Sequence, residues 1–127
     1  MSFRTEKHDN YSIIVFSTDK LDSIVAPDLK SELVLINKSG EKNIIMDLSS
    51  VKYCDSSGLS AILTGYRVCQ QSNGIFIICG LQTAVEKLMT ISQLTTVLDI
   101  TTTLPAALDL FYEKQLSVNS DENNANE

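Results

Sequence analysis

The stretch from Ile44 to Leu59 constrains the fold of this chain most, because it holds a strand and the start of a helix with only a short connection between them. Residues 44–46 read Ile-Ile-Met, an apolar and largely β-branched run that is too short for a helix, which predicts a buried strand. Apolar residues then recur at helical spacing at Leu59, Ile62, Leu63 and Tyr66. The sequence therefore predicts a strand, a connection and a helix, in that order.

The connection carries an acid and two hydroxyls where the helix is expected to begin, at Asp55, Ser56 and Ser57, followed by Gly58. The first backbone N–H groups of a helix lack partners within the helix, so a Ser or Asp side chain there accepts hydrogen bonds from them, and the helix dipole favours negative charge. These residues leave two interpretations open. Ser56 or Ser57 is an ordinary N-cap, or the corner is a functional site.

Strands and helices alternate along the rest of the chain. The other strands are expected at residues 2–5, 11–16, 75–79 and 97–100. Three further helices are expected, with apolar faces at Leu29, Leu33 and Ile36, at Val85, Leu88 and Met89, and at Leu104, Leu108 and Phe111. This order predicts an α/β fold, with a mixed four- to five-stranded sheet and about four helices packed on it.

Length and composition predict one domain followed by a tail. The chain has 127 residues, of which 43% are hydrophobic, enough for one core. We expect the domain at 1–116 and a disordered acidic tail at 117–127, because the tail is Asn, Asp, Glu and Ser with Val118 as its only aliphatic residue. No apolar run approaches the ~20 residues of a membrane helix, and the start has no apolar signal segment, so a cytoplasmic protein is expected.

The charge pattern argues against nucleic acid as a partner. The formal net charge is −6, and the ten Lys and Arg residues are scattered singly or mixed with acids. Phosphate backbones are bound by clustered basic side chains, which this sequence lacks. Because the tail holds Asp121, Glu122 and Glu127 and no basic residue, the domain itself carries about −3, an ordinary value.

Catalytic and metal-binding chemistries lack the residues they need. Cys54, Cys69 and Cys79 are odd in number, form no C-x-x-C pair and share the chain with one histidine, His8, so neither a disulfide framework nor a zinc site is expected. Cys69 and Cys79 are expected to be buried, while the state of Cys54 stays open. No G-x-S-x-G elbow or glycine-rich phosphate loop occurs. The sequence predicts a binding module without catalytic residues, cofactor or metal, not an enzyme.

Several segments together resemble a known family. They are Leu21-Asp22, the strand end Met46-Asp47-Leu48, the corner Asp55-Ser56-Ser57-Gly58-Leu59, the strand 74–79 and the stretch 87–94. With these segments in register, most of the chain resembles a STAS domain, and more closely a bacterial anti-sigma factor antagonist, also called an anti-anti-sigma factor.

The resemblance implies a switch between partners. In such a cycle the unphosphorylated antagonist binds an anti-sigma factor that is also a serine protein kinase, phosphorylation releases it, and a metal-dependent serine phosphatase resets it. The resemblance assigns the phosphate to Ser56 and partner binding to Asp22, Asp55, Ser56, Ser57 and Gly58. The charge pattern, the short apolar runs and the missing motifs described above lead us to expect no nucleic acid, membrane or cofactor.

The chain departs from the family pattern at several positions. Asp19-Lys20 stands where Gly-Glu often precedes Leu-Asp, which reverses the charge at the second position. Cys54 replaces a common methionine, and Ser60 and Gln93 replace frequent glycines. The alternative to the switch is a STAS-type interaction or nucleotide/ligand-binding module in a regulatory pathway that involves no sigma factor.

Overall fold

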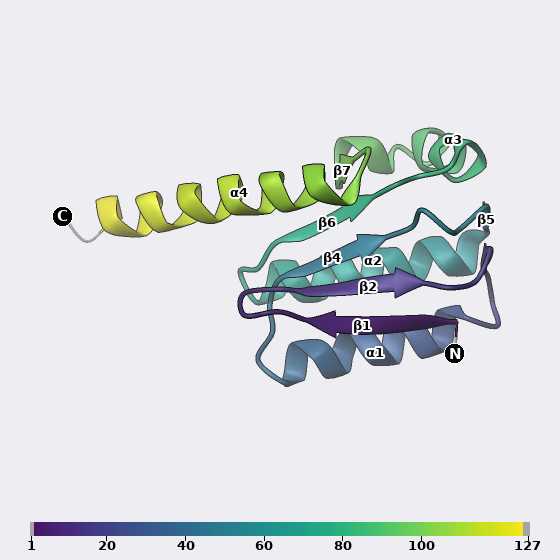
Figure 1. Ribbon diagram of the computed structural model, residues 1–127, viewed down its shortest axis with the longest axis horizontal. Helices are drawn as coiled ribbons and strands as arrows, with labels where there is room; N and C mark the ends of the chain where they lie inside the picture. Colours follow the sequence, from purple (N-terminus) through teal and green to yellow (C-terminus); the bar gives the residue numbers. More distant parts are fainter. Residues whose placement is uncertain (1, 126–127) are drawn as a thin grey trace.

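A five-stranded mixed sheet forms the centre of the molecule (Figure 1). The computed structural model describes residues 2–125 of the chain. In sheet order the strands are β1 (Phe3–Lys7), β2 (Ser12–Phe16), β4 (Ile44–Asp47), β6 (Phe76–Cys79) and β7 (Asp99–Thr101). β1 runs antiparallel to β2, and all other neighbours are parallel. The predicted α/β fold and mixed sheet are confirmed, with strand ends shifted by one or two residues.

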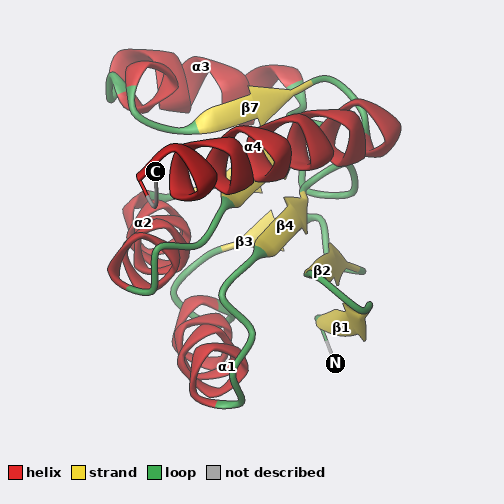
Figure 2. Ribbon diagram, turned by 90° about the vertical axis from the view of Figure 1, so that its left-hand side faces the viewer, coloured by secondary structure: helices red, strands yellow, loops and turns green. Residues whose placement is uncertain are grey.

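Helices cover both faces of this sheet. Figure 2 shows α1 (Ala26–Lys38) and α2 (Ser56–Gln71) together on one side, while α4 (Leu104–Ala125) crosses the other. α3 (Thr83–Ile91) contributes Val85 and Met89 to the core on the α1 and α2 side, and a short 3-10 helix, η1 (Leu94–Thr96), leads to β7. The expected number of about four helices is confirmed.

The two faces of each central strand serve different cores. Successive side chains of a strand point to opposite faces. Accordingly Met46 and Ile78 pack in the core under α1 and α2, while Ile45 and Ile77 pack with Phe111 of α4. All five side chains are fully buried. This explains why β4 and β6 read as uninterrupted apolar runs.

The buried face of α2 differs from the predicted one. Ile62 is fully buried, but Leu59 and Tyr66 are only partly buried, and so is Leu63. The residues that face the core are mainly small, at Gly58, Ala61, Gly65 and Cys69. At Gly65 an added Cβ would lie 2.7 Å from the Phe76 ring. α2 therefore lies closer to the sheet than a leucine-rich face would permit.

α4 continues beyond the expected domain boundary. Its apolar face at Leu104, Leu108 and Phe111 packs on the sheet as predicted. The helix runs to Ala125, and at this end of the chain residues 126–127 lie outside the described part, so the disordered tail expected at 117–127 stays a prediction. Extending an existing helix adds one hydrogen bond for each residue fixed, so a polar segment can continue a helix that it would not nucleate. The division at 116/117 stays a prediction.

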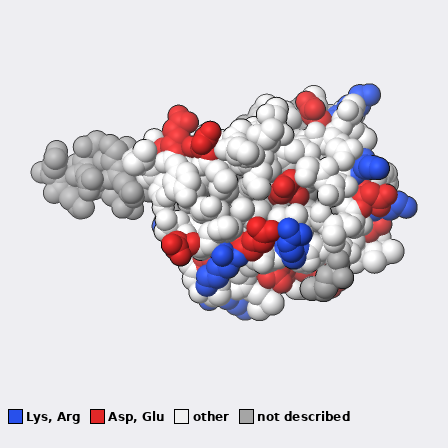
Figure 3. Space-filling view, in the orientation of Figure 1, with Lys and Arg blue, Asp and Glu red and all other residues white. Residues whose placement is uncertain are grey.

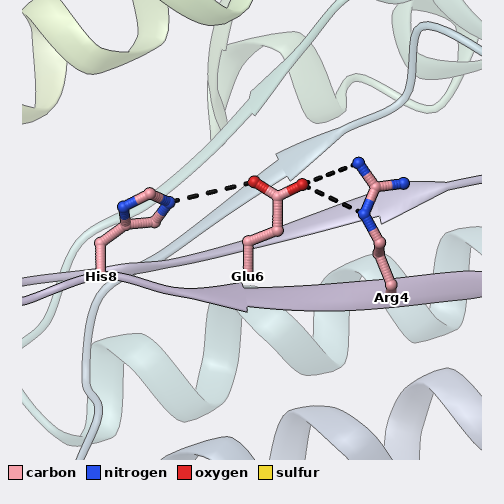
Figure 4. Close-up of polar contacts among 3 residues, drawn as sticks. All are labelled: Arg4, Glu6 and His8. Atoms are coloured by element: carbon pink, nitrogen blue, oxygen red, sulfur yellow. Dashed lines mark hydrogen bonds and ion pairs between the residues drawn. The ribbon is translucent and has the colours of Figure 1, made fainter.

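The outer strand β1 carries a row of charged side chains (Figure 4). Glu6 accepts hydrogen bonds from Arg4, at 3.1 Å from Nε and 2.8 Å from Nη2, and its other oxygen lies 4.0 Å from His8 Nε2. His8 is exposed. Charges on an edge strand discourage pairing with strands of other chains. Figure 3 shows acidic and basic side chains intermixed on this side of the molecule.

No helix in residues 2–125 combines the length and apolar character needed to span a bilayer.

Candidate functional site

The candidate site lies at the edge of the sheet where the parallel strands end. After β4 the chain passes through residues 48–52 before it reaches a short strand at 53–54 and then α2. Leu48 and Val51 are buried in this connection, and the Asp47 carboxylate accepts a hydrogen bond from Ser49 N at 3.0 Å. The connection is therefore anchored at both ends.

A second, two-stranded sheet holds the site together, and the sequence analysis missed it. β3 (Lys20–Leu21) pairs in parallel with β5 (Tyr53–Cys54), so that Leu21 stands opposite Cys54. Asp55 N also donates to Leu21 O at 3.3 Å. Because Asp22 and Asp55 directly follow the paired residues, the structure places the two acidic loops side by side. Strands of two residues give no periodic signal, so only the tertiary structure reveals them.

Asp55 is the N-cap of α2, which corrects the expectation that Ser56 or Ser57 fills that position. Its backbone is extended, with φ −108° and ψ −171°, and its Oδ1 accepts a hydrogen bond from Gly58 N at 3.0 Å. Asp is as good an N-cap as Ser, and the cap is the last residue with a non-helical backbone. Ser56 is therefore the first helical residue, and its side chain is free of the capping role.

The switch candidate Ser56 is exposed, whereas Ser57 is half-buried. Among the described residues, the Ser56 hydroxyl has no hydrogen-bond partner. Its backbone is nevertheless fixed, because the preceding residue, Asp55, is held by its capping hydrogen bond from Gly58 N and follows directly on the pairing of β3 with β5. The result is an accessible hydroxyl on a rigid support.

Position 58 has room only for glycine, because the backbone of β3 and the Cys54 side chain lie against it. A Cβ at this position would lie 2.3 Å from Leu21 O and 2.6 Å from Cys54 Sγ. Leu21 O cannot easily withdraw, because it accepts the hydrogen bond from Asp55 N. The glycine thus brings α2 against β3 and sets the position of the serines.

Asp22 has a local structural task of its own. Its Oδ1 accepts hydrogen bonds from Ile24 N at 3.0 Å and Val25 N at 3.3 Å, and its carbonyl accepts from Ala26 N at 2.8 Å. Val25, the residue before α1, makes no side-chain cap, so Asp22 supplies the missing acceptor from three residues upstream. The loop holds Ile24 outward with 81% of its surface exposed.

A groove separates the first turns of α1 and α2, and sequence reasoning missed it. Its volume is about 390 Å³, and it is lined by Ser23, Ala26, Pro27, Lys30, Ser56, Ser57 and Ser60. The α1 side shows helical spacing from residue 23 to 30, but only the packing of α1 beside α2 reveals that it faces the serines. Lys30 is the only ionisable side chain in this lining.

The three cysteines are buried and unpaired. Burial raises the pKa of each thiol to about 12, and the neighbouring Asp55 adds to the effect at Cys54. The predicted burial of Cys69 and Cys79 is confirmed, and Cys54 shares their environment. A thiol with so high a pKa stays protonated near neutral pH and reacts slowly.

His8 lies at the opposite edge of the sheet from Ser56. It occupies the turn between β1 and β2, next to the residues where β2 and β4 begin, whereas Ser56 follows the edge where β4 ends. A general base must lie within hydrogen-bond reach of the proton it takes, so His8 cannot activate Ser56. In the part of the chain that is described, no three His, Cys, Asp or Glu side chains gather as metal ligands.

Comparison with known proteins gives matches over most of the chain. The family model of the STAS domain matches residues 2–107. The anti-sigma-B factor antagonist of Listeria monocytogenes is 24% identical over 100 residues, which is 79% of this chain and 88% of that protein.

Solved structures share the fold. An anti-sigma factor antagonist from Mycobacterium paratuberculosis superposes with a TM-score of 0.77 at 23% identity, covering 87% of this chain and 92% of that one. SpoIIAA, a Bacillus cell fate determinant solved in its phosphorylated form, gives 0.67 at 20% identity, covering 84% and 96%. Because these identities are low, the structural likeness shows that the fold is shared and shows nothing further.

Proposed function

This chain belongs to the STAS domain family, and on that premise we propose that it acts in the cytoplasm as an anti-sigma factor antagonist in a partner-switching cycle. Unphosphorylated, it binds an anti-sigma factor that is also a serine protein kinase. Phosphorylation of Ser56 releases it, and a metal-dependent serine phosphatase restores the binding form. The chain itself is a regulator without catalytic residues.

The observation that carries this proposal is the exposed Ser56 hydroxyl on a rigid corner. A kinase needs an accessible hydroxyl, and a partner needs a surface of constant shape. Asp55, Gly58 and the pairing of β3 with β5 supply that shape without engaging the Ser56 side chain. The name of the Listeria monocytogenes relative and the phosphorylated form of SpoIIAA support the same role.

Phosphorylation changes the charge of this surface. The γ-phosphoryl group of ATP forms a bond to Ser56 Oγ, ADP leaves, and the hydroxyl proton passes to the kinase. The added charge is about −1.5 to −2 at pH 7, next to Asp55 and near Asp22. The docking edge, which already carries Asp22 and Asp55, thus becomes more negative, and this disfavours a partner that fits the unmodified surface. Ile24 and Tyr53, exposed by 81% and 52%, give that edge its apolar contacts.

Phosphate mapping with matched variants tests the site. The protein is incubated with ATP and an extract of its own cells, and the phosphorylated residue is located by mass spectrometry. We expect one phosphate on Ser56, none in Ser56→Ala, and an unchanged phosphate on Ser56 in the control Ser57→Ala. Since Ser56 is not the cap, Ser56→Ala should change the free energy of unfolding by less than about 0.5 kcal/mol. A phosphate on Ser57 alone, or none at all, contradicts the proposal.

Partner capture tests the switch itself. Wild-type protein, Ser56→Ala and Ser56→Asp are compared as baits, and the captured proteins are identified. Ser56→Ala should retain an anti-sigma factor with a kinase domain, and Ser56→Asp should lose it. Equal retention by Ser56→Asp would rule out release by charge.

One observation favours the alternative, a ligand-binding module. A cavity of about 510 Å³ lies at the other end of α2 and falls within the size range of ligand pockets. Tyr66, Phe76 and Leu110 form apolar walls, and Lys114 pairs with Asp99 at 3.0 Å. Binding of ATP or GTP that Tyr66→Ala abolishes, together with an unphosphorylated Ser56, would favour this function over the switch.

A further inference from the structure

The groove between α1 and α2 is lined by both Ser56 and a positively charged side chain, Lys30. Its α2 wall carries the hydroxyls of Ser56, Ser57 and Ser60, and its α1 wall carries Lys30. Ser60 lies one helical turn after Ser56, so both hydroxyls are on the same side of α2. A group attached to Ser56 Oγ therefore has a groove of about 390 Å³ beside it.

Lys30 has no acidic partner there. It is half-buried, and within the described residues its ammonium takes part in no ion pair or hydrogen bond. Asp22 and Asp55, which precede the lining residues Ser23 and Ser56, do not line the groove themselves: Asp22 accepts from Ile24 N and Val25 N, and Asp55 accepts from Gly58 N. Asp28, two residues before Lys30 in α1, lies on a different side of the helix and is exposed. The groove thus holds one positive charge and no negative side chain of its own.

A phosphate on Ser56 would complement this arrangement. We infer, on the basis of the proposed phosphorylation, that Lys30 holds the phosphate of phosphorylated Ser56 and draws it into the groove. The ammonium has three donors on a flexible stem, and a phosphate dianion has three acceptor oxygens. The Ser60 hydroxyl supplies a further donor from the α2 wall, one turn after Ser56.

This contact has two measurable consequences. A nearby cation favours the dianion over the monoanion, so it lowers the second pKa of the phosphate. The side chain also covers the phosphate from one side, which slows its removal by a phosphatase that recognises phosphoserine without regard to sequence. The negative charges of Asp55 and Asp22 raise the second pKa of the phosphate, whereas Lys30 lowers it. The direction in which this pKa shifts therefore shows which charge lies nearer to the phosphate.

The test uses protein with phosphoserine inserted at position 56 during translation, so that no kinase is required. The second pKa of the phosphate is measured by ³¹P NMR in wild-type protein, Lys30→Gln and Lys38→Gln. Lys38 lies in the last turn of the same helix, so its variant has the same net charge with the groove intact. We expect Lys30→Gln to raise the pKa by about 0.5 unit because an opposite charge is lost, and Lys38→Gln to leave it unchanged.

Two further measurements complete the test. Lys30→Arg should keep the low pKa, and alkaline phosphatase should remove the phosphate faster from Lys30→Gln than from wild type. Equal pKa values in wild type and Lys30→Gln, with both proteins folded by circular dichroism, overturn the assignment of Lys30. Because phosphoserine is built in, this failure is distinct from that of the proposed function, which shows as the absence of phosphate on Ser56 in cell extract.

Discussion

Helices α2 and α4 lie on opposite faces of one sheet and are held to it in different ways. α2 packs through small residues, and Gly58 and Gly65 leave no room for even a methyl group. α4 packs through larger side chains, chiefly Phe111, and extends past the sheet to Ala125 (Figure 1). Its exposed Tyr112 and Leu116 show how its contact with the core weakens along the chain.

The difference places rigidity at the N-terminal end of α2. A helix that approaches through glycine has one allowed position, whereas a helix that packs through Leu and Phe has several nearly equivalent ones. Ser56 opens the constrained helix, so its hydroxyl is held at a constant place relative to Asp22. A site that must be read by more than one partner gains from such constancy.

The largest effect expected within α2 comes from the one large side chain that this helix buries completely. Ile62→Ala should lower the free energy of unfolding by about 2–5 kcal/mol, because it removes buried methylenes and leaves a cavity. Leu63→Ala, next to it but only half-buried, should cost less than about 1.5 kcal/mol. Urea denaturation measures both. Equal costs would mean that α2 is rotated toward the face predicted from the sequence.

Substitution of the glycines tests the close approach directly. Gly58→Ala should cost about 3 kcal/mol, near the top of the range for overpacking, because its methyl group meets the Leu21 backbone. Gly65→Ala should cost about 1 kcal/mol, since the Phe76 ring can shift and Ala favours a helix by about 1 kcal/mol over Gly. Thermal unfolding provides the comparison. If Gly58→Ala lowers the stability less than Gly65→Ala does, the β3 backbone can shift away from α2 more easily than its hydrogen bonds indicate.

Sequence reasoning recovers the features that depend on periodicity. The apolar runs of β4 and β6 and the apolar faces of α1, α3 and α4 were predictable because burial repeats along each element. It failed for the α2 face because glycine and alanine give a weak hydrophobic signal. It also failed for the cap, since Asp55, Ser56 and Ser57 have similar capping preferences.

Features built from distant segments were out of reach. The pairing of β3 with β5 and the groove between α1 and α2 each depend on residues more than 25 positions apart, such as Leu21 with Cys54 and Lys30 with Ser56. The backbone explains why the family often has glycine at the position of Gln93. This residue adopts φ +61°, a conformation that glycine enters freely. The corner itself was found because its chemistry is contiguous in sequence.

Alkaline titration compares the two helices through their thiols. Cys69 lies on the buried face of α2, and Cys79 of β6 packs under α4, each with a pKa of about 12 against 9.0 for a free thiol. Above pH 9 the unfolded chain loses these protons while the folded chain keeps them, so stability falls as pH rises toward 12. Cys69→Ala and Cys79→Ala should each make that decline shallower by about 1 kcal/mol per pH unit. A smaller change for Cys79→Ala would mean that α4 opens in alkali before α2 does.

The smallest effect is expected from removing residues 117–127. Ser117 donates to Glu113 O and Leu116 is 70% exposed, so the contact of α4 with the core is already weak before the cut. The deleted segment has Val118 as its only large aliphatic residue and three of the sixteen acids, and it has little apolar surface to offset the entropy of ordering it. We expect a change in the free energy of unfolding below about 0.5 kcal/mol, with a smaller helical signal in circular dichroism.

The matched variant Phe111→Ala, in the packed part of α4, should cost about 3–5 kcal/mol. A loss of more than about 2 kcal/mol on truncation would show that the end of α4 belongs to the domain, and the boundary at 116/117 would then be wrong.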